Sequence, residues 1–281
     1  MKILGIVVCY YPNVEELCYN INQYVDYVDK LIIWKNSPII ESEISPFANN
    51  NFNSKIIFMG NEDNEGIAHP LNIAREMLLS GNEKFTHLLT MDQDSIWENF
   101  EYYKEQILEF NQDLIFSPNI NRELNSVNPF TIVNMCITSG AVFSKYTLIK
   151  IGLFNETYSV DCVDYAFSFE AKKNSINIIK INCASMKQNY GVLVNSKFFG
   201  FNIQNNSYSA KRLYFLARNC ILLWRDYPKE VDADFKKIIL KSYIFGKAVK
   251  ILLLEKDKFS KIFSIFLGFF AGIVNNRTKR Y

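Results

Sequence analysis

The chain has 281 residues, of which 49% are hydrophobic and 21% are charged, and its formal net charge at pH 7 is +2. This length and composition suit one large globular domain or two small ones with a real core. A charge so close to zero argues against a dedicated nucleic-acid-binding protein, so we expect no nucleic-acid partner.

Buried strands and helices alternate over the first hundred residues. Apolar runs predict strands at residues 3–9, 31–34, 56–59 and 86–91, and helical spacing predicts helices at 15–28 and 67–79. This alternation predicts an open α/β sheet flanked by helices, with ligands at the carboxyl ends of the strands. Tyr10, Lys35 and the segment Asp92-Gln93-Asp94 all follow such strand ends.

The rest of the chain gives weaker signals. A further strand is predicted at 114–116, and an apolar stretch at 132–142 contains Ser139 and Gly140. After Tyr208 the pattern is helical. No G-x-G-x-x-G motif follows the first strand, which argues against a nicotinamide dehydrogenase.

Six cysteines stand singly inside apolar runs, and no two of them have Cys-x-x-Cys spacing. With two histidines in the chain, this pattern argues against a structural zinc site. Isolated buried thiols are typical of a reducing compartment. Because the N-terminal residues also lack the features of a signal peptide, we expect a cytoplasmic protein.

Asp92 and Asp94 lie one residue apart in a turn after an apolar strand. Two such carboxylates can share a hard cation with substrate phosphates, because Mg²⁺ and Mn²⁺ prefer a few carboxylates plus phosphate oxygens. The alternative is an ordinary turn, since aspartate often begins turns and caps helices.

A second acidic pair, Asp161 and Asp164, has the i, i+3 spacing of one helical face. Such a site can supply a general base for attack by a hydroxyl group. The alternative is a helix N-cap at Asp161, with Asp164 in the first turn stabilised by the helix dipole.

Two arginines, Arg212 and Arg218, lie on a predicted helix with Asn219. Arginine pairs can clamp a diphosphate bidentately. The alternative is a solvated helix face beside an aromatic core stripe.

Taken together, these motifs resemble family 2 glycosyltransferases, especially the bacterial rhamnosyltransferase-like branch. The resemblance runs from about Ile3 to about Asp226 and includes the segments 6–12, 28–37, 64–72, 88–95, 138–141, 151–156, 160–164 and 212–219. It implies a GT-A fold, a Rossmann-like open mixed sheet with C-terminal helices. It also implies a catalytic domain at 1–226 and a basic, amphipathic helical extension at 227–281.

The resemblance assigns roles to single residues. It implies that Asp94 meets the metal, that Asp92 lies near the donor ribose and sugar, and that Asp164 is the catalytic base. The remaining donor-side residues that we expect are Tyr10, Lys35, Gly66, Asn72, Arg212 and Arg218. The expected acceptor-side residues are Ser139, Gly140 and Asp161.

Three positions depart from the family pattern. Lys35 stands where an aspartate usually touches the nucleobase, Ala166 replaces an acidic residue, and Gln188 replaces a histidine. The first change alters base recognition, and the third removes a metal ligand.

The resulting hypothesis is an inverting transferase that needs Mg²⁺ or Mn²⁺ and moves a sugar from a nucleotide-sugar donor to a glycan or lipid-linked glycan. L-rhamnose from dTDP-rhamnose is the first candidate donor, and a UDP-hexose is the second. A non-catalytic module that binds sugar nucleotides or glycans is the alternative from another class.

The C-terminal segment is strongly basic. From Lys236 onward the chain has eleven basic residues against two acidic ones. Phe263, Phe266, Phe269 and Phe270 are spaced for one helical face, and the longest apolar run, at 262–274, is too short to span a bilayer comfortably. We therefore expect peripheral docking on the anionic inner face of the plasma membrane. The alternative is a helix packed against the catalytic domain.

Overall fold

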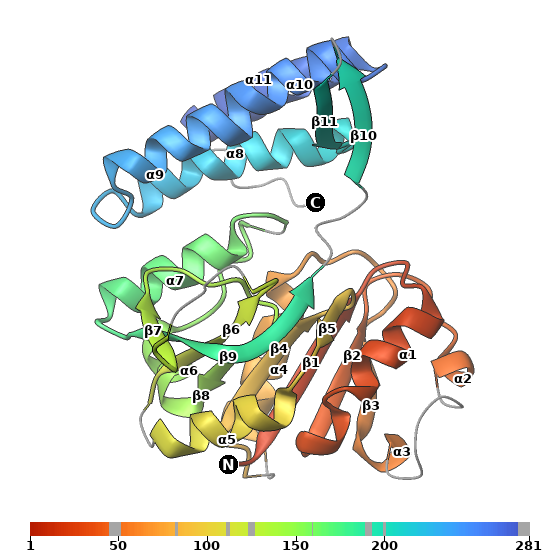
Figure 1. The fold of residues 1–281 in the computed structure, drawn as a ribbon, viewed down its shortest axis with the longest axis vertical. Coiled ribbons are helices and arrows are strands. Elements are labelled where there is room, and N and C mark those ends of the chain that lie inside the picture. Colours follow the sequence, from red (N-terminus) through yellow and green to blue (C-terminus); the bar gives the residue numbers. More distant parts are fainter. Residues whose placement is uncertain are drawn as a thin grey trace.

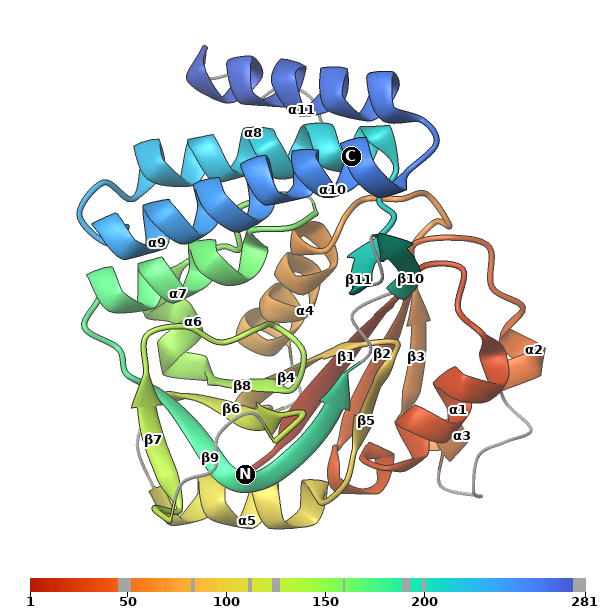
Figure 2. The same ribbon diagram turned by 45° about the horizontal axis from the view of Figure 1, so that its top comes forward.

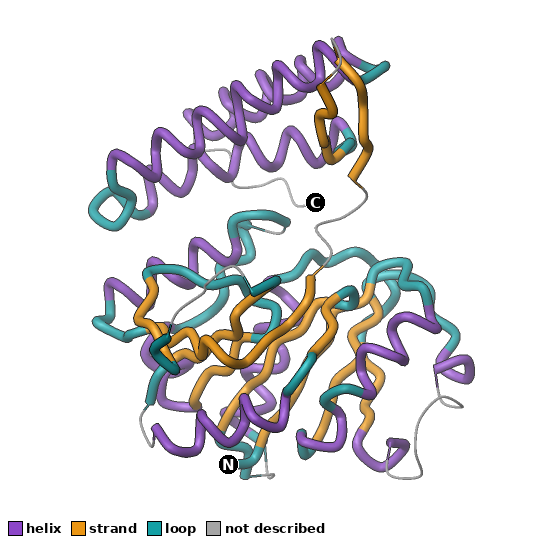
Figure 3. Tube along the Cα trace, viewed as in Figure 1, coloured by secondary structure: helices purple, strands orange, loops and turns teal. Residues whose placement is uncertain are grey.

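The computed structural model describes residues 1–44, 52–81, 84–110, 113–122, 127–158, 160–188, 193–198 and 201–274. Over these residues the chain forms a nine-stranded mixed sheet with flanking helices, and a layer of helices stands beyond one edge of this body (Figures 1 and 3). A two-stranded hairpin joins the two parts.

The sheet has the order β3-β2-β1-β4-β8-β6-β9-β5, and β7 pairs with β9 outside this path. The first four of its strands in chain order, β1 to β4, are parallel, whereas β8 is antiparallel to both of its neighbours. The strands are β1 (Ile3–Cys9), β2 (Lys30–Lys35), β3 (Ile56–Met59), β4 (His87–Asp92), β5 (Ser95–Trp97), β6 (Ile115–Ile120), β7 (Phe130–Val133), β8 (Ala141–Ser144) and β9 (Ile178–Gln188).

Both faces of the sheet are covered. Along β1, Ile3 and Val7 belong to one apolar core and Leu4 and Ile6 to the other, because successive side chains in a strand point to opposite faces. A continuous apolar run is the pattern expected for such a doubly covered strand. The helices packed around the sheet are α1 (Val14–Asn22), α2 (Glu41–Ile44), α3 (Phe52–Lys55), α4 (Ala68–Ser80), α5 (Phe100–Phe110), α6 (Lys145–Ile151) and α7 (Val163–Lys173).

The predicted strands and the helix at 67–79 are confirmed, with small shifts at their ends. The predicted helix at 15–28 is shorter: α1 ends at Asn22, and a 3-10 turn at Val25–Tyr27 follows. Tyr24, Val25 and Val28 are buried in the core on one face of the sheet. Their helix-like spacing therefore belongs to a packed connection and not to a longer helix. Strands β5 and β9 and the hairpin of β10 (Leu193–Phe198) and β11 (Phe201–Asn206) are not predicted from the sequence.

The C-terminal helices are α8 (Ala210–Asp226), α9 (Ala233–Ile238), a π-helical segment at Ile239–Phe245, α10 (Gly246–Leu254) and α11 (Lys258–Ile273). Their apolar side chains continue the core that begins on the sheet, so the C-terminal extension and the sheet share one core. In the described part of the chain, no helix has the length and apolar character needed to cross a membrane.

Helix α11 lies directly against α8 (Figure 2). A Cβ atom added at Gly268 would lie 2.1 Å from the carbonyl oxygen of Tyr214, and one added at Gly272 would lie 2.8 Å from that of Arg218. Gly268 and Gly272 therefore allow the backbones of α8 and α11 to approach more closely than larger residues would permit. We call this contact the glycine seam.

We predict that Gly268→Leu lowers the free energy of unfolding by about 1–3 kcal/mol, the usual cost of overpacking a tight contact. Urea unfolding of the full chain measures this. Phe266→Leu, on the exposed side of the same helix, is the matched control and should change stability little. Equal stability of the two variants would contradict the close contact at the glycine seam.

Candidate active site

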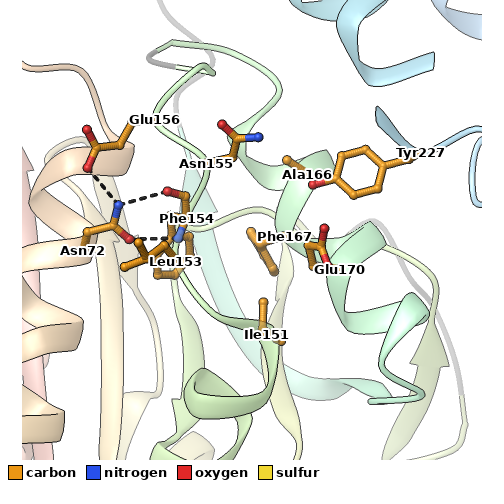
Figure 4. A pocket seen from close by; sticks show the side chains of 10 residues that line it. All are labelled: Asn72, Ile151, Leu153, Phe154, Asn155, Glu156, Ala166, Phe167, Glu170 and Tyr227. Atoms are coloured by element: carbon orange, nitrogen blue, oxygen red, sulfur yellow. Dashed lines mark hydrogen bonds between the residues drawn. The ribbon is translucent and has the colours of Figure 1, made fainter. Parts of the chain in front are cut away.

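Two aspartates from distant parts of the sequence, Asp92 and Asp164, line one cleft. Its volume is about 440 Å³, and it lies between the sheet and the helical layer. Asp92 and Gln188 line one side, the segment from Val160 to Tyr165 lines another, and α8 closes it with Arg212, Leu216 and Cys220. A cavity of similar size, about 450 Å³, lies beside Asn72, but neither of these two aspartates lines it (Figure 4).

The turn after β4 is held by Gln93, the residue between the two aspartates. Its side-chain oxygen accepts from the backbone N–H of Tyr10 (2.6 Å), and its side-chain nitrogen donates to the carbonyl of Tyr10 (3.1 Å). Asn20 donates to the Gln93 carbonyl (2.9 Å). Gln93 thus ties the turn to the end of β1 and leaves Asp92 and Asp94 on either side of it.

Asp92 experiences several like charges in a buried setting. Burial and the nearby carboxylates of Asp164 and Asp94 raise the pKa of Asp92 to about 7, against a hydrogen bond from Gln188. Burial also raises the pKa values of Asp94 and Asp164. A cation here would be stabilised, because it would offset the repulsion among these carboxylates.

The donor set at this point suits a divalent cation that keeps few protein ligands. Gln188 donates from Nε2 to Asp92 (2.8 Å), while its buried Oε1 has no hydrogen-bond partner among the described residues. Two carboxylates and an amide oxygen are acceptable ligands for Mg²⁺ or Mn²⁺. Within the described residues, no group of three histidine, cysteine or acidic side chains is placed to hold a metal.

Asp164 stands in the first turn of α7, after two residues in a left-handed backbone conformation. Asp161 has φ of 56° and Cys162 has φ of 67°. This conformation is costly for residues other than glycine and persists where the surroundings enforce it. The Asp164 carboxylate accepts a hydrogen bond from the backbone N–H of Thr138 (2.9 Å) and lines the cleft.

Helix α8 supplies the groups that hold this turn. Arg212 binds both carboxylate oxygens of Asp161 (3.1 and 2.9 Å). Asn219 donates to the carbonyls of Val160 (2.8 Å) and Asp161 (3.3 Å). Asp161 therefore ties the segment before α7 to α8 through its ion pair with Arg212. The N-cap of α7 is Cys162 and not Asp161.

Several expected residues lie behind the cleft. Arg218 is fully buried and donates to the Thr157 carbonyl (2.7 Å), so the structure does not bring it to the cleft as a second clamping arginine. Ser139 is also fully buried; it accepts from the backbone N–H of Asp92 (3.0 Å). Gly140 is next to it, with φ of 76°, and no space for a Cβ beside Pro118.

The expected nucleotide side forms a separate group of contacts. Tyr10 is half-exposed at the end of β1, and Lys35 is held in an ion pair with Glu41 (2.8 Å), which raises the pKa of Lys35. The Gly66 carbonyl accepts from Asn36 (2.7 Å). Asn72 joins α4 to the segment before α7, because it exchanges hydrogen bonds with the backbone of Phe154 (2.9 and 2.8 Å; Figure 4).

Other residues that line the cleft were not singled out from the sequence. They are Lys180 on β9, Tyr208 before α8, Tyr165 on α7 and Tyr243 on the π-helical segment. The hydroxyl groups of Tyr165 and Tyr243 are 3.1 Å apart and link α7 to the helical layer. None of the four belongs to a recognisable motif, so a sequence signal for them is lacking.

No family model and no curated protein sequence matches this chain. Solved structures do resemble it. The crystal structure of GalNAc-T7 with UDP, GalNAc and Mn²⁺ has a TM-score of 0.59 at 11% identity and covers 86% of this chain. This chain spans 55% of the GalNAc-T7 chain.

The crystal structure of S. aureus TarS residues 1–349 has a TM-score of 0.56 at 14% identity, with 95% of this chain and 81% of that chain covered. Both neighbours are GT-A glycosyltransferases, and the curled open sheet with flanking helices gives this chain the same fold. The predicted fold class is confirmed.

We predict that Asn219→Ala lowers the free energy of unfolding by about 1–3 kcal/mol, because the partly buried carbonyls of Val160 and Asp161 lose their donor. Chemical denaturation measures the loss, with the exposed Lys229→Ala as control. A stability as high as that of the control would show that Asn219 does not hold the turn.

Proposed function

We propose that this protein is an inverting glycosyltransferase that uses a nucleotide-sugar donor. The observation that carries the proposal is the meeting of Asp92 and Asp164 at one cleft of a GT-A fold, with Asp94 close enough to Asp92 to help raise its pKa. Two of these carboxylates follow a strand, where α/β sheets bind ligands, and the third comes from a separate helix. The site thus offers a metal position and a base from different elements.

Asp94 would hold Mg²⁺ or Mn²⁺, with Asp92 and Gln188 beside it. When bound, the metal supplies charge neutralisation for the departing diphosphate. The crystallisation of GalNAc-T7 with UDP and Mn²⁺ supports this assignment. Arg212 and Tyr10 would contact the donor, since one lines the cleft and the other is half-exposed at a strand end.

Asp164 would accept the proton of the attacking acceptor hydroxyl. In a single displacement the base lies on the face of the sugar opposite the leaving group, so the anomeric configuration inverts. The hydrogen bond from the backbone N–H of Thr138 orients this carboxylate in the cleft. Ser139 and Gly140 would act on the acceptor side only indirectly, by supporting the turn that carries Asp92.

L-rhamnose from dTDP-rhamnose remains our first candidate donor, on the D-Q-D-S motif at 92–95. A UDP-hexose is the second, and the UDP-bound neighbour favours it. Lys35 forms an ion pair with Glu41 and lies 3.6 Å from Glu62. A carboxylate therefore still lies near the position where we expect the nucleobase of the donor. The acceptor would be a glycan or lipid-linked glycan, met by a cytoplasmic enzyme on the inner face of the plasma membrane.

The proposal is tested with a panel of dTDP- and UDP-sugars, by measuring release of the nucleoside diphosphate. We predict slow hydrolysis of one donor in Mg²⁺ or Mn²⁺, its loss in EDTA, and the same loss in Asp94→Ala, because both changes remove the cation from the diphosphate. Full activity in excess EDTA would contradict the metal assignment. Binding without turnover of any donor would favour a non-catalytic module.

We predict that Asp164→Asn lowers transfer by about 10²–10⁴-fold, because the amide cannot accept the proton. Donor binding should stay close to that of the wild type, which calorimetry with the donor identified above would measure. Asp257→Asn, at an exposed position on the helical layer, is the matched control. Wild-type turnover in the Asp164 variant would exclude this residue as the base.

A further inference from the structure

The two faces of α11 are the reverse of those of an ordinary surface helix. Its buried positions are mostly small or polar and are Lys261, Ile265, Gly268, Ala271 and Gly272. Four of its phenylalanines point outward, with 93% of Phe259, 60% of Phe263, 57% of Phe266 and 47% of Phe270 exposed. Figure 2 shows α11 as the outermost layer of the molecule.

This reversal follows from the glycine seam. At Gly268 and Gly272 the backbones of α8 and α11 lie too close for a large side chain, and Phe263, Phe266 and Phe270 lie on the outer side of α11 instead. Leu267, Ile273 and Val274 are exposed with them. An apolar surface of this size on a soluble domain marks a place where something apolar binds.

Helix α10 extends the same surface. Val249 and Leu252 are each 52% exposed, Leu253 is 43% exposed, and Phe245 just before the helix is 65% exposed. We call the exposed apolar residues of these two helices and of Phe245 the aromatic face. It belongs to a part of the chain that shares its core with the sheet, and is not a loose tail.

The charges around the aromatic face identify its partner. From Lys236 to Val274 there are eight lysines and two acids, and one of those acids, Glu255, is buried in an ion pair with Lys261. Lys250 and Lys256 are exposed close to the apolar residues in the chain. An apolar surface with basic residues around it complements lipid chains and anionic headgroups. A second copy packed symmetrically on this face would instead bring lysines against lysines.

We propose that the aromatic face docks on an anionic lipid bilayer, with the phenylalanines of α11 at the level of the acyl chains and the lysines at the headgroups. The proposal rests on the proposed function for its biological setting alone. It refines the residues expected from the sequence: Phe269 packs against the core and Lys261 is buried, so neither faces the lipid. Arg277, Lys279 and Arg280 lie outside the described residues.

The test uses the full chain and vesicles of phosphatidylcholine with or without phosphatidylglycerol. We expect flotation with the anionic vesicles at low salt, weaker binding to neutral ones, and release as salt screens the lysines. Phe263→Ser with Phe266→Ser should weaken partitioning by at least about tenfold, because it removes apolar area from the lipid contact. Tyr146→Ser with Ile149→Ser, exposed apolar positions on α6, is the matched control and should float like the wild type.

Two results would overturn the proposal: no binding to anionic vesicles at low salt, or a dimer in vesicle-free solution that the Phe263 and Phe266 substitutions dissociate. The second result would assign the face to another copy of the chain. Donor hydrolysis without acceptor is measured on the same variants and should not change. Loss of flotation with intact hydrolysis therefore separates a failure at the lipid contact from a failure of the proposed activity.

Discussion

The grip of α8 on the segment before α7 is the contact on which the site depends. Two consecutive residues, Asp161 and Cys162, occupy a left-handed conformation that a free chain would leave. Arg212 and Asn219 bind this segment from one side of α8, and a buried Arg218 binds the Thr157 carbonyl upstream. The backbone strain is thereby offset, and the first turn of α7 starts where Asp164 reaches the cleft.

The turn that carries Asp92 is also held by side chains from other elements. Gln93 binds the end of β1, and Ser139 binds the Asp92 backbone while its hydroxyl contacts that of Ser95 (2.8 Å). Gln93 and Ser139 hydrogen-bond the backbone, and among the described residues no basic side chain offsets the repulsion that the carboxylates of Asp94 and Asp164 exert on Asp92. A site that concentrates negative charge before its ligand arrives is built to receive a cation or a proton.

Much of the fold was predictable because β1, β2 and β4 are buried on both faces and so appear as unbroken apolar runs. Strand β9 was missed because it pairs with β6, β7 and β5 and shifts register along β6, which mixes polar and apolar residues without a period. Asp92 and Asp164 were found through local motifs. Lys180 and Tyr243 were not, because only tertiary packing brings a mid-strand lysine and a π-helical tyrosine to the same cleft.

The glycine seam between α8 and α11 also sets the distance between the cleft and the outer surface of α11. Leu216 and Cys220 of α8 line the cleft, whereas α11 contacts the other side of α8 at Tyr214, Ala217 and Ile221. Two stacked helices separate the cleft from the outer surface of α11 by about 20 Å. On a bilayer, this pair of helices would hold the cleft clear of the headgroups. The cleft of the proposed transferase would then be reached by acceptor groups that extend this far from the bilayer.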